Sequence, residues 1–199
     1  MIGTARTRIG DNRRMRSGTR YRRRGWLPGL FIPALGLATL QAASIPDVPG
    51  VPNFHQVDEH VYRGGQPRGQ GFASLAKIGI HTVIDLRGES SEETAVQSAG
   101  MRYVRLPWRE FKAPADSQIE ALLALLNDSS EWPVFVHCRR GADRTGTAIA
   151  CYRIAHDHWS NQRALAEAKT FGMSSMEIGM QRFILHFAAP APDTASSTR

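Results

Sequence analysis

The stretch Pro133–Ile149, PVFVHCRRGADRTGTAI, decides the fold that we expect for this chain. Val134–Val136 is a short run of β-branched and aromatic residues after a proline, which is typical of a buried strand. The loop 138–144 follows, and Thr145 then opens a predicted helix. Because the backbone N–H groups of such a loop and of the first helical turn converge on one spot, this order predicts an anion-binding site.

Four residues give this site its expected chemistry. The pKa of a free thiol is ~8.5, and helix N-termini and nearby cations lower it to roughly 3.5–7.5, so we expect Cys138 to be a nucleophilic thiolate. The planar guanidinium of Arg144 matches two phosphate oxygens once the loop curls over the site. Gly141 permits the backbone conformation that turns the N–H groups inward. Thr145 places a hydroxyl near the sulfur, where it would stabilise the thiolate as a leaving group.

These residues form the pattern His137-Cys138-x-x-Gly141-x-x-Arg144-Thr145. The pattern closely resembles the signature of the cysteine-dependent protein tyrosine phosphatase superfamily. The alternative is a structural, buried cysteine beside an ordinary strand-to-helix turn.

The resemblance extends from about Phe54 to Phe187. The stretches Tyr62–Pro67 and Ile84–Arg87 and the C-terminal helices are similar to those of atypical dual-specificity phosphatases of plants and fungi, and still more to those of exported bacterial relatives. The resemblance implies one phosphatase domain with a shallow pocket, no metal and no cofactor. It also implies that Cys138 attacks phosphorus while Arg144 holds the equatorial oxygens.

A carboxylic acid must then protonate the leaving alcohol and later activate water. Relatives place this acid on the loop before the long helix, some thirty residues ahead of the cysteine. Glu110, 28 positions ahead of Cys138, is the first candidate, and Asp116, 22 positions ahead, is the second. Asp116 is alternatively the N-cap of the helix predicted over 114–127. Glu110 is alternatively a solvated loop charge.

The resemblance makes the loop residues phosphate-binding: Arg139, Arg140, Gly141, Ala142, Asp143 and Arg144. Arg139 and Arg140 add positive charge to the site or are solvated at the surface. Asp143 is expected on the rim, where it orients Arg144 or a neighbouring arginine. Some relatives that act on phosphoinositides or inositol polyphosphates carry lysines in this loop, and Ala142 at one such position weakens that alternative.

Two further residues have supporting roles in this interpretation. His137 is expected to hydrogen-bond the loop backbone rather than to act as a base. Arg87, at the end of a predicted strand, either supports the loop, contacts substrate, or is an ordinary charge at a strand end.

The positive charge of the chain lies in its first residues. Residues 1–25 hold nine Arg and one Asp, whereas residues 26–199 hold 16 Lys and Arg against 17 Asp and Glu. The predicted domain is therefore near neutral, and we expect no nucleic-acid binding, which needs its basic surface on the domain itself.

The N-terminal segment has the pattern of an export signal. Residues 26–43 carry no charge, follow the basic stretch, and end in the small residues around Ser44. We expect a bacterial protein that is exported, to the periplasm or as a secreted protein. The alternatives are an uncleaved anchor that contacts the membrane through residues 26–43, or a basic tail without a targeting role.

The rest of the chain predicts an α/β fold with a mostly parallel central sheet flanked by helices. An edge hairpin is expected over 54–63, strands over 81–86, 102–107 and 134–136, and helices over 71–77, 92–99, 114–127, 161–171 and 176–187. Ligands of such sheets bind at the carboxyl ends of the strands, where Cys138 and Arg87 fall. The expected division of the chain is 1–44 leader, 45–53 linker, 54–189 phosphatase-like domain and 190–199 disordered tail.

These observations favour a monomeric phosphatase for phosphotyrosine, with phosphoserine or phosphothreonine as further targets, whose partner is a phosphorylated protein or a small phosphate ester. A second hypothesis is a phosphoinositide or inositol phosphate phosphatase that uses the same site. A third, of another class, is a phosphate-binding module without turnover. Sulfur or arsenic chemistry is disfavoured because the second cysteine, Cys151, lies about two helical turns beyond the loop.

Overall fold

The computed structural model describes residues 48–88 and 92–190. The predicted leader 1–44 lies outside these residues, and so does the predicted tail 190–199 except for Pro190. Within the two described ranges, no helix combines the length and the hydropathy that a membrane span requires.

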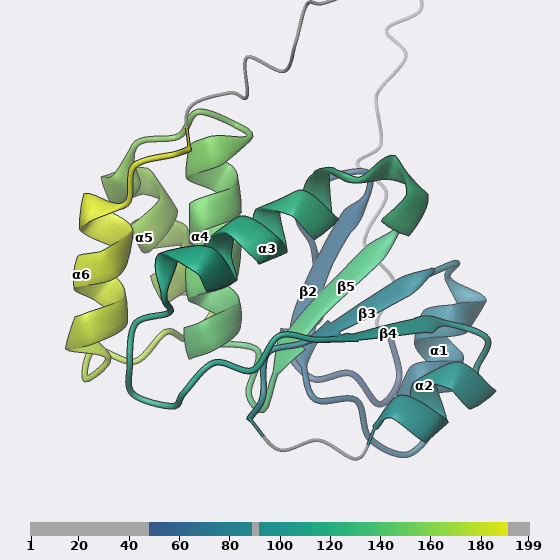
Figure 1. The fold of residues 1–199 in the computed structure, drawn as a ribbon. Helices are drawn as coiled ribbons and strands as arrows, with labels where there is room; N and C mark the ends of the chain where they lie inside the picture. Colours follow the sequence, from purple (N-terminus) through teal and green to yellow (C-terminus); the bar gives the residue numbers. More distant parts are fainter. Residues whose placement is uncertain (1–47, 89–91, 191–199) are drawn as a thin grey trace, which may run out of the picture. The chain divides into compact units, whose positions relative to one another are not determined.

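Five strands form one sheet, in the order β1-β2-β5-β3-β4 (Figure 1). β1 pairs antiparallel with β2, as the predicted hairpin requires, and the other three pairings are parallel. The mostly parallel sheet is therefore confirmed. The strand bounds are β1 His55–Gln56, β2 Val61–Gly65, β3 Thr82–Asp85, β4 Arg102–Arg105 and β5 Val134–Cys138.

Helices cover both faces of this sheet, with α1 and α2 on one side and α3 to α6 on the other (Figure 1). A short 3₁₀ turn, Ser129–Glu131, precedes β5. The helix bounds are α1 Gly71–Lys77, α2 Glu93–Ser98, α3 Asp116–Asn127, α4 Asp143–Ala155, α5 Asn161–Thr170 and α6 Ile178–His186. All the predicted helices are present, and α4 begins at Asp143, two residues before the predicted start.

The alternation of side chains along β5 divides the core between the two faces. Val134, Val136 and Cys138 pack in the cluster formed with α3 and α4. Phe135 packs in the cluster beneath α1 and α2, and the ring of His137 stacks on it at 5.6 Å between centroids. Neighbouring residues of the motif therefore point to opposite faces of the sheet.

The predicted linker is wrong from residue 48 onward. Val48 and Val51 are buried in the cluster beneath α1 and α2, and the Gly50 carbonyl accepts a hydrogen bond from the backbone N–H of Arg68 at 2.8 Å. This segment belongs to the folded unit because its two valines supply core. The prolines and the glycine of this segment suggested an extended linker. The two valines, three residues apart, were the better indication of a segment that packs against the core.

Candidate active site

Cys138 ends the central strand β5, and its side chain lines a cavity of about 570 Å³ at the carboxyl end of the sheet. The residue is only 2% exposed, so the surrounding loop encloses it. Glu110 and Arg144 line the same cavity. A thiol and a guanidinium of one loop are thus brought together with a carboxylate from a separate part of the chain.

Gly141 shapes the loop Cys138–Arg144, and no other residue fits its place. Its φ is +71°, and a Cβ at this position would lie 2.3 Å from the carbonyl carbon of Gly64. Its own carbonyl accepts hydrogen bonds from Arg63 Nη2 at 2.8 Å and from Asn53 Nδ2 at 3.0 Å. Gly141 thus has a backbone conformation that glycine permits, and two side chains from the start of the domain hold the loop in that conformation.

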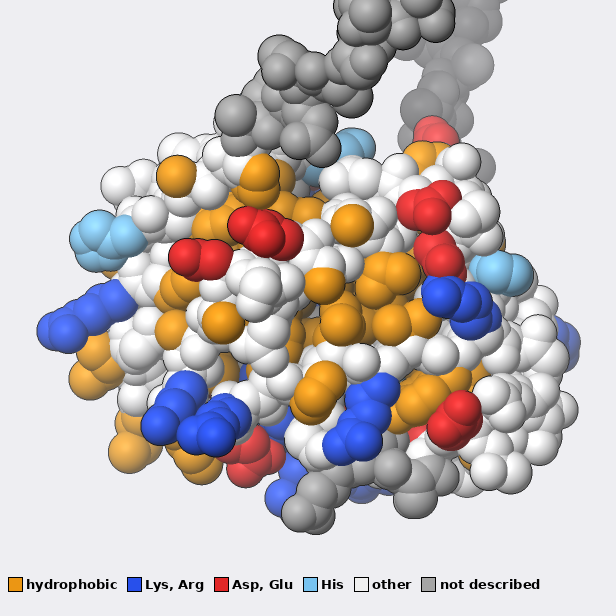
Figure 2. Space-filling model, in the orientation of Figure 1, with side chains coloured by type: hydrophobic (Ala, Val, Ile, Leu, Met, Phe, Trp, Pro, Cys, Tyr) orange, Lys and Arg blue, Asp and Glu red, His pale blue; other side chains and the backbone are white. Residues whose placement is uncertain are grey.

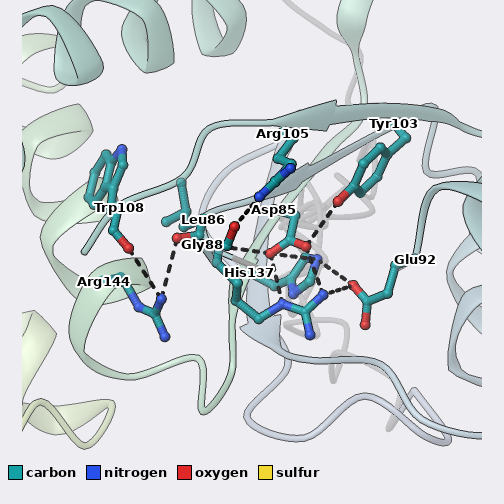
Figure 3. Close-up of polar contacts among 10 residues, drawn as sticks. Asp85, Leu86, Gly88, Glu92, Tyr103, Arg105, Trp108, His137 and Arg144 are labelled. Atoms are coloured by element: carbon teal, nitrogen blue, oxygen red, sulfur yellow. Dashed lines mark hydrogen bonds and ion pairs between the residues drawn. The ribbon is translucent and has the colours of Figure 1, made fainter. Parts of the chain in front are cut away.

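The guanidinium of Arg144 is held at the mouth of the cavity. Its Nη1 lies 3.5 Å from the carbonyl of Leu86, which follows β3, and 3.4 Å from that of Trp108, which lies beyond the end of β4 (Figure 3). Its Nη2 donates to Glu110 Oε1 at 2.9 Å. Because the side chain is only 7% exposed, these contacts fix its orientation before any anion binds.

The two acid candidates lie in different places. Glu110 is 55% exposed, pairs with Arg144 and lines the cavity of Cys138. Asp116 is the first residue of α3 and lines a separate hollow beside Phe183 and Phe187. The structure therefore brings Glu110, and not Asp116, to the thiol.

The predicted N-cap role of Asp116 is also wrong. Ala115 occupies the N-cap position of α3, and its backbone N–H donates to Gln118 Oε1 at 2.9 Å. Asp116 follows as the first helical residue, where a negative charge is favourable because of the helix dipole. The helix therefore begins one residue earlier than the predicted cap requires.

The remaining polar loop residues surround the cavity. Arg140 forms an ion pair with Asp143, which also accepts a hydrogen bond from the backbone N–H of Ser174 at 2.9 Å. Asp143 therefore orients the neighbouring Arg140, one of its two predicted roles, and not Arg144. Ala142 is 5% exposed. Arg139 is exposed and borders both this cavity and an adjoining hollow.

Thr145 is fully buried in the first turn of α4, and its hydroxyl has no hydrogen-bond partner among the described residues. The predicted stabilisation of the Cys138 thiolate by this hydroxyl stays a prediction, for which a buried donor without a partner is available.

His137 belongs to a charged network on the opposite face of the sheet (Figure 3). Its Nε2 lies 3.5 Å from Glu92 Oε2 and 3.9 Å from Asp85 Oδ1. The alternation of β5 turns this ring to the face of Phe135, and the backbone of Cys138, which begins the loop, is also within its reach. Burial lowers the pKa of His137 to about 4, against an opposing effect of Asp85. The ring is therefore neutral at pH 7.

Arg87 is the cation of the same network. Its Nε and Nη2 donate to the two carboxylate oxygens of Asp85 at 2.9 and 2.7 Å, and Nη2 also contacts Glu92. Tyr103 donates to Asp85 at 3.1 Å. Of the three roles predicted for Arg87, support of the loop agrees best with these contacts. The reason is that its partners Asp85 and Glu92 lie against His137, the residue before Cys138.

The same network contains the one group of described residues whose spacing would suit a metal ion. The ligand-type atoms of Asp85, Glu92 and His137 all lie within 4.8 Å of one another. Arg87 contacts both carboxylates. A metal ion there would compete with a guanidinium that already neutralises the two acids, so the donor set does not fit one.

Arg63 is a site residue that the sequence interpretation missed. It is 1% exposed, donates to the Gly141 carbonyl, and stacks over the ring of Phe171 with 4.3 Å between its Cζ and the ring centroid. Burial lowers its pKa to about 10, while the nearby Glu167 and Cys138 favour its charge. It is therefore a buried cation near the nucleophile. The signal was the stretch Tyr62–Pro67, to which no role had been given.

An apolar wall forms the other side of the Cys138 cavity. Phe111 and Met176, which are 78% and 86% exposed, both line it, together with the buried Met180. Large apolar side chains so exposed at the mouth of a cavity commonly mark a binding surface. Sequence reasoning gave no role to either.

Comparison with known proteins agrees with this geometry. The model of a family described as a DSP-PTPase phosphatase fused to NAD+ kinase matches residues 46–185. The dual specificity protein phosphatase TpbA of Pseudomonas aeruginosa is 29% identical over 120 residues, which cover 60% of this chain and 55% of TpbA. The chain thus spans about half the length of that relative.

Two further similarities are informative. The inositol diphosphatase DSP4 of Arabidopsis thaliana is 28% identical over 139 residues, covering 66% of this chain and 70% of DSP4. Among solved structures, a cysteine-to-serine variant of P. aeruginosa TpbA in complex with phosphotyrosine superposes with a TM-score of 0.62 at 25% identity, covering 71% of this chain and 86% of the other.

Proposed function

The chain belongs to the family of DSP-PTPase phosphatases, and from this premise we propose that it hydrolyses phosphate monoesters through a phosphocysteine intermediate. The observation that carries the proposal is the placement of Cys138, Arg144 and Glu110 around one cavity. The phosphocysteine chemistry is typical of this fold and needs only these protein groups.

In the first step, the Cys138 thiolate attacks phosphorus. An S–P bond forms and the P–O bond to the leaving alcohol breaks. Arg144 and the N–H groups of the loop stabilise the equatorial oxygens, because they are oriented before the charge develops. The carboxyl group of Glu110 donates its proton to the leaving oxygen.

In the second step, water attacks the phosphocysteine, and the Glu110 carboxylate takes the proton of that water. The S–P bond breaks, inorganic phosphate leaves, and the thiolate is restored. Glu110 must leave its contact with Arg144 during this cycle, because Nη2 of the guanidinium, which it occupies, has to bind phosphate. Its exposed position on the loop 106–115 allows that exchange.

The substrate that we favour is a phosphorylated protein, with phosphotyrosine as the preferred residue. Phe111 and Met176 form an apolar wall that suits an aromatic leaving group, and TpbA, a similar protein, has been solved with phosphotyrosine. The alternative, an inositol phosphate, has support of its own in the similarity to the inositol diphosphatase DSP4.

Hydrolysis of para-nitrophenyl phosphate by the full chain under reducing conditions tests the proposal. We expect turnover that Cys138→Ser abolishes. Cys151→Ala is a matched control, because Cys151 is fully buried in α4 and burial raises the pKa of its thiol. If phosphate binds but the wild-type protein shows no turnover, the chain is a phosphate-binding module and the proposal is wrong.

We further propose that the protein is exported. The support is the basic stretch, the uncharged residues 26–43 and the small residues before Ser44. Sequencing the N-terminus of the mature protein tests this, with cleavage near Ser44 as the expected result. An intact N-terminus on a membrane-bound protein would instead favour the anchor.

A further inference from the structure

A second hollow of about 840 Å³ adjoins the Cys138 cavity. Both hollows are lined by Glu110, Arg139 and Arg144. The second hollow therefore lies next to the catalytic arginine. Pro107 and Trp108 also line it.

The two hollows differ in charge. In the Cys138 cavity, three arginines face the carboxylates of three acids, Glu110, Asp143 and Glu177. In the second hollow, the four arginines Arg87, Arg109, Arg139 and Arg144 face one acid of the wall, Glu110. Positive charge therefore exceeds negative charge only in the second hollow. Figure 2 shows several Lys and Arg side chains along the lower edge of one face of the molecule.

Two of these four arginines already have carboxylate partners. Arg87 contacts Asp85 and Glu92, and Arg144 contacts Glu110. Among the residues that the structure describes, no hydrogen bond or ion pair is formed by the side chains of Arg109 or Arg139. The positive charge of these two guanidinium groups therefore has no carboxylate partner among the described residues. Arg139 lines both hollows.

A phosphate group matches this arrangement. The planar fork of arginine binds phosphate oxygens through paired, charge-assisted hydrogen bonds. A phosphate held by Arg109 and Arg139 would lie next to the phosphate that is held by Arg144 and attacked by Cys138. One molecule that carries two nearby phosphate groups would fill both places.

We propose that the second hollow is an anion subsite that binds a second phosphate group of the substrate, with Arg109 and Arg139 as its binding residues. This rests on the proposed phosphatase function and narrows its substrate to esters with more than one phosphate. Two sources supply such a group, a polyol polyphosphate and a peptide with two neighbouring phosphorylated residues.

The test uses the full-length protein with para-nitrophenyl phosphate as reporter substrate. Inhibition constants are measured for inorganic phosphate, for myo-inositol hexakisphosphate, and for one peptide in its singly and doubly phosphorylated forms. The readout is the gain in affinity that the second phosphate provides. For at least one source, we expect a gain of roughly tenfold or more, equivalent to one good charged contact.

In Arg109→Ala this gain should fall about tenfold, and Arg109→Lys should restore part of it because the charge returns without the fork. Arg182→Ala, which removes an exposed arginine of α6 outside both hollows, is the matched control for net charge and should keep the gain. The source that shows the gain identifies the kind of substrate.

The subsite is contradicted if neither source gains from its second phosphate, or if Arg109→Ala and Arg182→Ala lose the gain equally. Absence of turnover on the reporter contradicts the proposed function instead. In that case calorimetry with inorganic phosphate and myo-inositol hexakisphosphate still measures the gain, so the two failures are distinguishable.

Discussion

Arg63 Nη2 donates to the carbonyl oxygen of Gly141 at 2.8 Å, across 78 positions of the chain. The guanidinium is almost fully buried and lies beneath the loop whose other side faces the cavity. The conformation of the loop therefore depends on a side chain of β2 as well as on the loop's own sequence.

Replacing Arg63 should affect both stability and activity. Arg63→Met removes a partner of a buried carbonyl, which we expect to cost about 1–3 kcal/mol of unfolding free energy. It should also lower kcat/KM, because the loop loses a contact that orients it. Urea unfolding and steady-state kinetics measure the two effects. Arg63→Lys keeps the charge and should recover part of both; equal stability and activity for Arg63→Met and wild type would contradict this role.

Gly141→Ala and Gly100→Ala form a matched pair. Both glycines have positive φ, at +71° and +81°, but a Cβ at Gly100 meets no atom within 4 Å. Gly100→Ala should cost about 1–2 kcal/mol of unfolding free energy for the backbone conformation alone. Gly141→Ala should cost more and should abolish turnover, because its Cβ would overlap the backbone of Gly64. Equal losses of stability in the two variants would show that the close approach is unimportant.

Glu110→Gln tests the general acid. We expect kcat on phenyl phosphate to fall by about 10²–10⁴, and less on para-nitrophenyl phosphate, since nitrophenolate leaves without needing a proton. The dependence on leaving group distinguishes proton donation from the simple loss of the Arg144 contact. Asp116→Asn is the control, and its rates on both substrates should stay near those of wild type. The reverse pattern would restore Asp116 as the acid.

His137 should make stability depend on pH. Its pKa is about 4 in the folded protein against 6.5 in the unfolded chain, so between these values the unfolded state binds more protons. Unfolding free energy should therefore fall as pH drops from 6.5 to 4, by about 3 kcal/mol from this group.

The measurement is the difference between wild type and His137→Gln, because Glu92 also titrates in this network and its pKa is raised by burial. NMR of the imidazole should show a neutral ring down to about pH 4. A ring that titrates near pH 6.5 would contradict the burial argument.

Much of this architecture was predictable from local patterns. The β-branched run before Cys138 predicted a strand, and the spacing from Cys138 to Arg144 predicted a loop followed by a helix. The structure has β5, this loop and α4 in that order. The helix predicted over 114–127 is likewise present as α3, and it buries Ile119, Leu122 and Leu126. Such features depend on neighbours in sequence, which a pattern captures.

Contacts between distant segments were not predictable in this way. Arg63 is polar within a strand, and nothing in its neighbourhood indicates that Gly141 is its partner. The orientation of His137 required the register of β5 against both faces of the sheet, and the choice between Glu110 and Asp116 required the path of the loop 106–115. These depend on tertiary packing, which one sequence does not display.

The central claim is that Cys138 carries the phosphoryl group during turnover. Acid quenching of the full-length protein within its first turnover of para-nitrophenyl phosphate, followed by peptide mass spectrometry, tests it most directly. The account predicts one added phosphoryl group on the peptide that contains Cys138, none on the peptide that contains Cys151, and none at all in Cys138→Ser. Turnover without that adduct, or turnover that persists in Cys138→Ser, would contradict it.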